Sequence, residues 1–205
     1  MRNQEAPAPT TTTRPIFITV ERFLQRPESN LPEQLIQGYV VRDPAPGVPH
    51  QLLVGRLHLI LHGALGETGQ GLVLVAPVDV VLSRQTVLQP DVLVIRAGRQ
   101  AVVGDRVEGP PDLVVEVESP TTRERDLTIK RMLYAQSGVP EYWFVSGAGR
   151  FVLQMTEPSG DDYSVKVVHG GKETLRSTTF PDLRVRLAAL WDEPAARTGG
   201  HCPDR

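Results

Sequence analysis

The chain of 205 residues contains a single cysteine, Cys202, so no intramolecular disulfide and no cysteine-rich metal site can form. A lone cysteine close to the C-terminal end also argues against a thiol catalyst, and it fits a reducing compartment. The first fifteen residues, MRNQEAPAPTTTTRP, lack the apolar core of a signal peptide. No apolar run is long enough to span a bilayer. We therefore expect a cytoplasmic protein without a membrane partner.

An excess of positive charge is also missing, since the formal net charge is −2 and the pI is about 6.2. Proteins that hold nucleic acid without sequence preference usually carry a basic face, which this composition does not supply overall. A local basic patch is still possible within one stretch, and scattered solvated arginines are the alternative. The basic residues of that stretch are Arg96, Arg99, Arg106, Arg123, Arg125, Lys130 and Arg131.

Two common sequence motifs are absent, one that binds phosphate groups and one that is typical of ester hydrolases. The chain has no glycine-rich phosphate loop and no G-x-S-x-G nucleophile elbow, which excludes these P-loop and serine-hydrolase mechanisms. Hydrophobic residues make up 40% of the chain and aromatic residues only 5%, with many positions held by valine and leucine. That bias is typical of a sheet-rich core with helices packed on it.

The pattern of the chain predicts one α/β domain at 16–191, between a Pro- and Thr-rich flexible leader (1–15) and a disordered tail (192–205). We expect helices at 17–26, 50–67 and 123–137. We expect strands at 35–43, 71–83 (two segments), 87–96, 111–119 and 139–146. Further antiparallel strands are expected at 150–156, 162–168 and 172–177, whereas 184–190 is ambiguous. The order predicts a mixed β-sheet flanked by helices, followed by a C-terminal hairpin region.

The ends of the predicted helix 123–137 have local signals. Thr121 and Glu124 have the spacing of a capping box, which predicts a helix that starts after Thr121. Gly138 follows the last helical residue and suits a C-terminal cap in the left-handed region. This helix therefore follows directly on the valine-rich strand 111–119.

Two carboxylates interrupt strands that are otherwise apolar. Asp91 opens the run Val92–Ile95, and Glu116 lies inside the sequence VVEV. A carboxylate in a buried strand is costly unless it is paired or binds a cation. On neighbouring strands the two could converge on one point and bind a hard divalent ion such as Mg²⁺. The alternative is that each is a salt-bridged or edge-exposed side chain.

Lys130 points to the same place. On the predicted helix it shares a face with Leu127, Leu133 and Tyr134, so it lies within the apolar arc and not on the solvent side. A lysine that faces the sheet needs an anion, and the strand with Glu116 is adjacent. The alternative is a surface pair with Asp126, four residues earlier.

Other polar residues carry weaker signals. Glu118 could be a further ligand or a charge at the end of the strand, and we favour the second interpretation. Asp79 could lie on the face of the site or on the opposite face. His50 is expected to be a cap or a surface residue. His58 and His62 have the spacing of zinc helices without the acidic partner of HExxH, so we interpret them as surface residues.

The string QPDVLVI, followed by PPDLVVEVESPTTRERDLTIKRMLYAQSGVPEYWFV, resembles the Uma-type restriction endonuclease family of the PD-(D/E)xK nuclease superfamily. The resemblance covers about residues 33–190. It implies a restriction-endonuclease-like fold and a Mg²⁺-dependent phosphodiesterase site, with Mn²⁺ as a possible substitute. Asp91 and Glu116 match the metal-binding acids of the family.

The chain differs from the superfamily pattern in the position of its lysine, and from the family pattern in two residues before the long helix. The usual superfamily lysine, two residues after the glutamate, is replaced by Glu118, and the lysine of Uma-type proteins on the following helix matches Lys130. Where the family often has the pattern E-L-I-D-G, this chain has amides, Gln34 and Gln37. Glu33 is one position away from the first of these.

These observations predict an endonuclease that hydrolyses DNA, with Asp91, Glu116 and Lys130 as catalytic residues and with Asp91, Glu116 and a carbonyl near Val117 as metal ligands. We expect double-stranded DNA as partner. A homodimer is expected because two strands require two sites. The alternatives are a nuclease-fold module that only binds or assembles, and a metal-dependent hydrolase of another phosphate ester.

Overall fold

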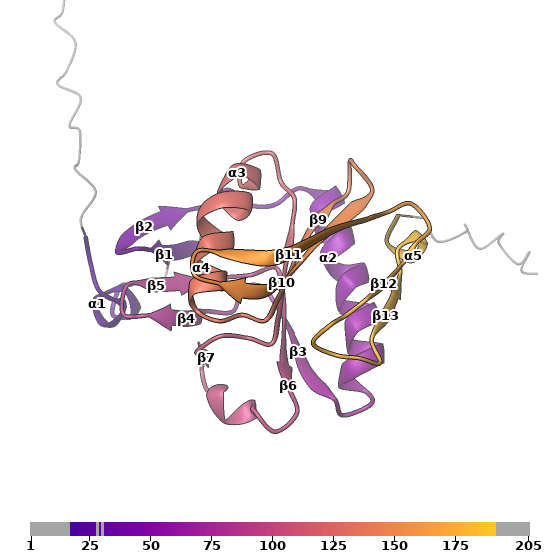
Figure 1. The fold of residues 1–205 in the computed structure, drawn as a ribbon. Coiled ribbons are helices and arrows are strands. Elements are labelled where there is room, and N and C mark those ends of the chain that lie inside the picture. The colour runs from indigo at the N-terminus through magenta and orange to yellow at the C-terminus, as the bar shows by residue number, and fades with distance from the viewer. Residues whose placement is uncertain (1–16, 28, 30, 192–205) are drawn as a thin grey trace, which may run out of the picture.

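The strands form two separate sheets and a hairpin in the computed structural model, which describes residues 17–27, 29 and 31–191 (Figure 1). The five-stranded sheet has the order β2-β1-β5-β4-β7, and the six-stranded sheet has the order β11-β10-β9-β8-β6-β3. Strands β12 and β13 pair with each other. The predicted leader 1–15 and tail 192–205, with Cys202, lie outside the described residues.

The strands are short and mostly antiparallel. The five-stranded sheet contains β1 (Glu33–Ile36), β2 (Tyr39–Arg42), β4 (Val80–Ser83), β5 (Thr86–Leu88) and β7 (Val107–Glu108). The six-stranded sheet contains β3 (Gly71–Val75), β6 (Val92–Arg96), β8 (Leu113–Val117), β9 (Glu141–Ser146), β10 (Phe151–Ser159) and β11 (Asp162–Gly170). The hairpin consists of β12 (Thr174–Arg176) and β13 (Arg184–Arg186). Because β8 pairs with β9 and β4 pairs with β7 in parallel, both larger sheets are mixed, which confirms the predicted mixed pairing but divides the strands between two sheets.

Helices cover both faces of the six-stranded sheet (Figure 1). The α-helices are α1 (Val20–Leu24), α2 (Val48–Leu61), α3 (Arg123–Arg125), α4 (Arg131–Gln136) and α5 (Ala188–Trp191). A π-helical turn (His62–Gly66) extends α2, another (Asp126–Lys130) joins α3 to α4, and a 3₁₀ turn spans Gln100–Val102. The predicted helices 50–67 and 123–137 are therefore both present.

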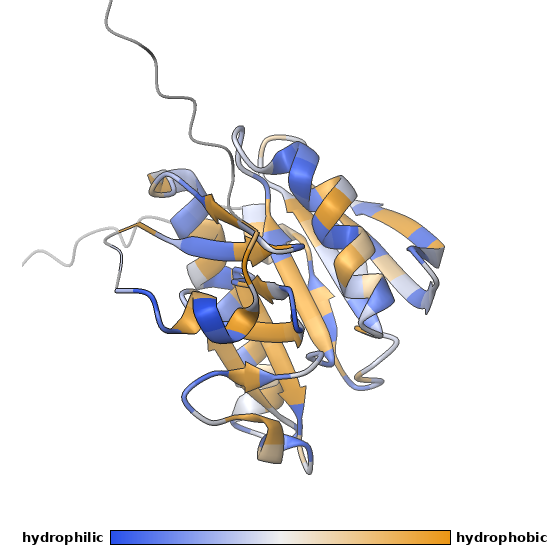
Figure 2. Cartoon of the chain, turned by 90° about the vertical axis from the view of Figure 1, so that its left-hand side faces the viewer, coloured by the Kyte–Doolittle hydropathy of each residue, from blue (hydrophilic) through white to orange (hydrophobic). Residues whose placement is uncertain are grey.

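The alternation along β8 decides which face each of its residues occupies. Val115 and Val117 pack in a core with the leucines of α2 and with the C-terminal hairpin. Val114 packs on the opposite face, with Leu133 and Tyr134 of α4. Successive side chains of a strand point to opposite faces, so Glu116 faces α4. In Figure 2 the central strands are mainly orange, whereas helices alternate between orange and blue, as expected for a sheet buried between amphipathic layers.

The predicted strand 35–43 is wrong, because the chain reverses in its middle. Gln37 and Gly38 both have positive φ, 50° and 85°, and join β1 to β2 as a tight hairpin in which Ile36 pairs with Tyr39. Two consecutive positive φ values are typical of the two-residue turn that matches the twist of antiparallel strands. The run of apolar residues on both sides of the turn concealed this reversal.

The predicted strand 87–96 is also divided. Its first part is β5, which pairs with β1 and β4, and its second part is β6, which pairs with β3 and β8 in the other sheet. The chain changes sheets at Gln89-Pro90-Asp91, where proline cannot donate a ladder hydrogen bond. The ambiguous segment 184–190 is strand β13 followed by α5.

The capping box predicted at Thr121 and Glu124 is not formed. Helix α3 begins one residue later than the motif requires, with Thr122 at the cap position and no side-chain cap bond. Instead, the Thr122 N–H donates to Ser119 Oγ over 3.2 Å. The C-terminal prediction is confirmed, since Gly138 has φ 78° and its N–H donates to the carbonyl of Ala135.

Candidate active site

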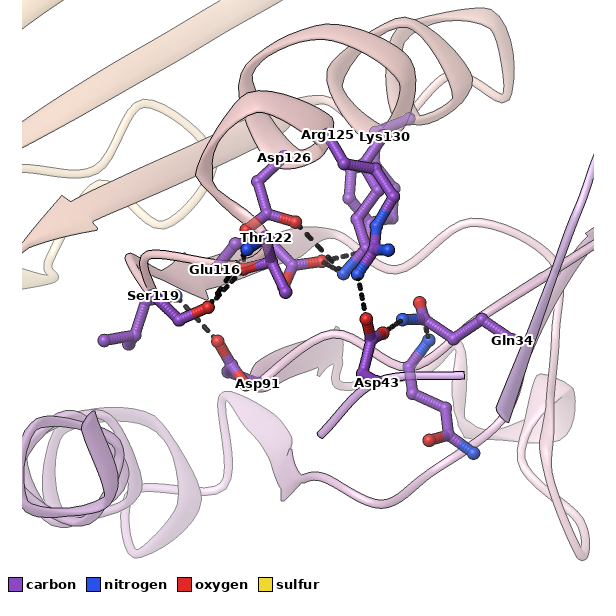
Figure 3. A network of polar contacts seen from close by, with 12 residues as sticks. Gln34, Asp43, Asp91, Glu116, Ser119, Thr122, Arg125, Asp126 and Lys130 are labelled. Carbon is purple, nitrogen blue, oxygen red and sulfur yellow. Dashed lines mark hydrogen bonds and ion pairs between the residues drawn. The ribbon is translucent and has the colours of Figure 1, made fainter. Parts of the chain in front are cut away.

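Asp91, Glu116 and Lys130, the three predicted site residues, line one pocket of about 380 Å³ between the two large sheets. Asp91 follows Pro90 at the change of sheets, Glu116 comes from β8, and Lys130 ends the π-helical turn before α4. Figure 3 shows their side chains converging from these three elements. The sequence patterns therefore identified residues that the fold brings together.

One oxygen of Glu116 is fully engaged by the helix that covers it. Lys130 Nζ donates to Glu116 Oε1 over 2.9 Å, and the Tyr134 hydroxyl donates to the same oxygen over 2.7 Å. Within the described residues, Glu116 Oε2 has no hydrogen-bond partner. Burial raises the pKa of Glu116 to about 8; Lys130 opposes this change, and the neighbouring Asp126 and Asp91 add to it.

Lys130 is held between two carboxyl groups. Besides Glu116, its Nζ lies 3.3 Å from Oδ1 of Asp126, four residues earlier on the helix. Both partners considered from the sequence are thus present, but the pair with Asp126 is buried and not on the surface. Burial alone would lower the pKa of Lys130, but the surrounding carboxylates outweigh it and raise that pKa. Lys130 is therefore a fixed positive charge at the pocket.

Asp126 is a residue of the site that sequence reasoning treated only as an alternative partner. Its Oδ2 accepts a hydrogen bond of 2.7 Å from the Thr122 hydroxyl, and its carbonyl accepts one of 3.1 Å from the Tyr142 hydroxyl. The i,i+4 spacing to Lys130 was the available signal. The π-helical turn that contains both residues could not be read from the pattern.

Asp91 is fixed by two donors on one oxygen. Its Oδ2 accepts the N–H of Val117 over 2.7 Å and lies 3.2 Å from Nε2 of His50. Within the described residues, Oδ1 of Asp91 has no hydrogen-bond partner. The first of these contacts ties the start of β6 to the end of β8, and so it sets the spacing between the two acidic residues.

His50 was predicted to be a cap or surface residue, and that prediction is wrong. It lies in the first turn of α2, and its side chain is 11% exposed and lines the pocket. Burial acts to lower the pKa of His50, but the hydrogen bond and the charge of Asp91 raise it overall, with contributions from the Val117 main chain and from Asp126. A lone histidine after a Pro-rich turn gave no signal of this contact.

A second polar cluster borders the pocket on the side of the five-stranded sheet (Figure 3). Gln34 Nε2 donates to Asp43 Oδ2 over 2.8 Å, and Gln34 Oε1 accepts the N–H of Gln89 over 3.0 Å. Arg125 Nη2 lies 2.5 Å from Asp43 Oδ1. The amide at position 34 thus holds an aspartate of the chain next to the pocket.

Glu33 does not replace the missing acids. Its carboxylate accepts hydrogen bonds from Arg26 and Arg42 and does not line the pocket that contains Gln34. Neighbouring residues of a strand point to opposite faces, which explains the difference. Gln37 lies in the turn between β1 and β2 and is also absent from the pocket.

The remaining candidates lie outside the pocket. Glu118 accepts hydrogen bonds from Arg123 and Ser146, in agreement with a charge at the end of a strand. Asp79 Oδ1 accepts a hydrogen bond of 2.8 Å from Gln89 Nε2. The imidazole rings of His58 and His62 stack on each other at 5.5 Å along α2.

The basic stretch seen in the sequence does not form a free cationic face. Most of its arginines are neutralised by a carboxylate, and in three cases the partner is distant in sequence. The pairs are Arg99–Asp112, Arg106–Glu108, Arg123–Glu118, Arg125–Asp43 and Arg131–Asp162. The local charge available for phosphate groups is therefore smaller than the residue count implies.

The donor set fits a hard divalent cation with an open coordination sphere. In the part of the chain that the structure describes, no three His, Cys, Asp or Glu side chains are arranged to hold an ion by themselves. Asp91 Oδ1 and Glu116 Oε2 are nevertheless two carboxylate oxygens at one pocket that have no hydrogen-bond partner among residues 17–27, 29 and 31–191. Magnesium is typically bound by one or two carboxylates plus waters and substrate oxygens, which matches this arrangement.

Comparison with known proteins gives one family and one fold. The sequence model of the family Uma2, described as a putative restriction endonuclease, matches residues 20–189. A crystal structure of a putative nuclease belonging to DUF820 from Anabaena variabilis superposes with a TM-score of 0.75 at 16% sequence identity. The match covers 85% of this chain and 97% of that chain. No curated protein matches. Among the described residues, no helix is long and apolar enough to cross a membrane.

Proposed function

Because the chain belongs to the Uma2 family of putative restriction endonucleases, we propose that it hydrolyses phosphodiester bonds of DNA with a divalent cation, Mg²⁺ or Mn²⁺. The observation that carries this proposal is the convergence of Asp91, Glu116 and Lys130 on one pocket. A structural protein gains little from burying a lysine among acidic groups, because the desolvation of such charges offsets most of their attraction.

The side chains divide the chemical work between them. Asp91 and Glu116, with a main-chain carbonyl near Val117, are the groups that would hold the cation. The bound cation would polarise the scissile phosphate and lower the pKa of an attacking water. The Tyr134 hydroxyl and Lys130 both donate to Glu116 Oε1, so Oε2 is the oxygen that would hold the cation.

Lys130 supplies the positive charge that the reaction needs on the protein side. The negative charge of the phosphate oxygens increases as the water attacks, and a preorganised cation stabilises that charge without reorganisation. Asp126 holds the ammonium group from the other side, over 3.3 Å. Because cleavage of both strands of a duplex requires two sites, we propose a homodimer as the active species.

A catalytically silent binding module is the second candidate, and the Gln34–Asp43–Arg125 cluster favours it. Gln34 is an amide where the family pattern has an acid, and Asp43 is already neutralised by Arg125. This side of the pocket therefore adds little negative charge for a second cation.

Cleavage of supercoiled plasmid DNA by the purified protein separates the two functions. Wild type with Mg²⁺ or Mn²⁺ is compared with Asp91→Ala, Lys130→Ala and the control Asp112→Asn. Asp112 is a buried carboxylate, bound by Arg99 and the Arg96 N–H, but it does not line the pocket. Metal-dependent nicking that only the first two substitutions abolish supports the nuclease. Equal and negligible cleavage by all four proteins supports the silent module.

A further inference from the structure

His50 contacts Asp91 in the pocket, and the proposed reaction leaves this histidine without a role. It is carried by the first turn of α2, after the segment Pro44–Gly47 that forms one wall of the pocket. Its ring is almost buried, at 11% exposure. The imidazole is therefore directed at the Asp91 carboxylate and is largely shielded from solvent.

In the hydrogen bond between His50 and Asp91, the donor can be identified from the chemistry of the acceptor. An ionised carboxylate can only accept hydrogen bonds, so Nε2 of His50 must carry the hydrogen that points to Asp91 Oδ2. The Val117 N–H is the second donor to that oxygen. Two donors from different elements, α2 and β8, therefore fix the carboxylate plane and leave Oδ1 without a protein partner among the described residues.

We propose that His50 is a positioning residue, which holds the Asp91 carboxylate so that Oδ1 is presented to the divalent cation. This inference rests on the proposed function. Hydrogen-bond partners of metal ligands orient the ligand and typically change metal affinity or activity by 10- to 100-fold when they are removed. Here the partner is a histidine and the ligand is a carboxylate, but the constraint on the ligand is the same.

Direct ligation by His50 is the rival arrangement. Nε2 is already directed at Asp91 Oδ2, and the described residues contain no group of three His, Cys, Asp or Glu side chains arranged around an ion. Both observations favour the positioning role. The two arrangements differ in what can replace the imidazole, because a positioning residue needs only an N–H at the place of Nε2.

The test measures Mn²⁺ affinity by titration calorimetry, independently of cleavage, for wild type and three variants. His50→Gln keeps an N–H donor near the place of Nε2, His50→Leu removes it, and His50→Asn carries an amide that is too short to reach Asp91. We expect Mn²⁺ binding to weaken 10- to 100-fold in the Leu and Asn variants. In His50→Gln we expect a change of less than about threefold, and thermal unfolding verifies that each variant is folded.

Each other outcome overturns the proposal. Equal affinity in all four proteins shows that His50 does not orient a metal ligand, and the nuclease proposal is unaffected. A Gln variant as weak as Leu, together with nitrogen coupling in the electron spin echo of bound Mn²⁺, identifies His50 as a direct ligand. Wild type that neither binds Mn²⁺ nor nicks DNA overturns the proposed function itself, together with the role of His50.

Discussion

Lys130 Nζ lies 2.9 Å from Glu116 Oε1, and the two side chains are 4% and 3% exposed although they are 14 residues apart. Lys130 also neutralises Asp126, so its removal leaves two buried carboxyl groups without a cation. We expect Lys130→Met to lower the free energy of unfolding by about 3 kcal/mol, measured by urea denaturation. Addition of Asp126→Asn removes one of the two acids and should recover part of the loss, without restoring any cleavage. Unchanged stability in Lys130→Met would contradict the buried pairing.

The substitution Tyr134→Phe tests the contribution of a single hydroxyl group to stability and to Mn²⁺ binding. Its hydroxyl donates to Glu116 Oε1 over 2.7 Å, and Tyr134→Phe deletes that oxygen alone. We expect a loss of about 1–2 kcal/mol in the free energy of unfolding. The Glu116 carboxylate also loses a donor, so Mn²⁺ affinity should fall. Tyr163→Phe is the matched control, because that buried hydroxyl donates to the carbonyl of Val139 instead, and its substitution should leave Mn²⁺ affinity unchanged.

The raised pKa of Glu116 predicts how stability depends on pH without metal. The group titrates near 4.5 when exposed and at about 8 in the folded protein, so the folded state holds the additional proton between these values. Stability from this group is complete below pH 4.5 and declines as pH rises through 8. In Glu116→Gln the decline is absent, so the variant should gain on wild type between pH 5 and pH 8.5 in EDTA. If the difference in urea midpoint between wild type and Glu116→Gln does not change with pH, the raised pKa of Glu116 is refuted.

Glu118 and Arg123 allow a test of how charge limits DNA binding. Their ion pair lies close to Ser119, at the edge of the pocket. We expect Glu118→Gln to release Arg123 for a phosphate contact, and to steepen the slope of log affinity against log salt by about 0.9. Fluorescence anisotropy with labelled duplex DNA at several salt concentrations measures that slope. Glu108→Gln is the control, because it releases Arg106, which lies away from the pocket. An equal change of slope in this variant would show that the effect does not depend on a position near the pocket.

Glu141 predicts a stability effect that is separate from the site. Its buried carboxylate accepts hydrogen bonds from Trp143, Gln154, Ser177 and the N–H of Thr179. It therefore anchors the segment between β12 and β13 to β9. We expect Glu141→Gln to cost about 3 kcal/mol, because an amide group then faces several donors. In Glu141→Gln we expect faster amide hydrogen exchange at residues 177–180 and an unchanged Mn²⁺ affinity of the folded protein.

The parts of the fold that were predicted correctly depend on local patterns. The valine-rich β8, the helical face that includes Lys130, and the glycine cap at 138 each follow from neighbouring residues. The same local rules identified Asp91 and Glu116, because carboxylates within apolar strands are conspicuous in any sequence. Lys130 reaches Glu116 because a short helix folds back on the strand before it, whereas Asp91 reaches the pocket through the pairing of β6 with β8.

The predictions that failed depend on pairing between distant segments. Whether 87–96 is one strand or two is decided by its partners in two different sheets, and nothing within the segment specifies them. The role of His50 depends on the approach of α2 to the start of β6, 41 residues later. The π-helical turn at 126–130 depends on packing around Asp126 and Lys130, which periodicity of 3.6 residues does not describe.

The change of sheets at Gln89-Pro90-Asp91 has a mechanical consequence. Asp91 follows this change of sheets and is tied to β8 by the N–H of Val117, so it belongs with Glu116 to the six-stranded sheet, whereas Gln34 lies on β1 of the other sheet. A small shear of one sheet against the other would change the distance between Gln34 and the two acids without breaking a ladder in either sheet. A substrate that bridges both walls of the pocket would resist this shear. A bound substrate would therefore restrain the relative movement of the two sheets that the segment Gln89-Pro90-Asp91 connects.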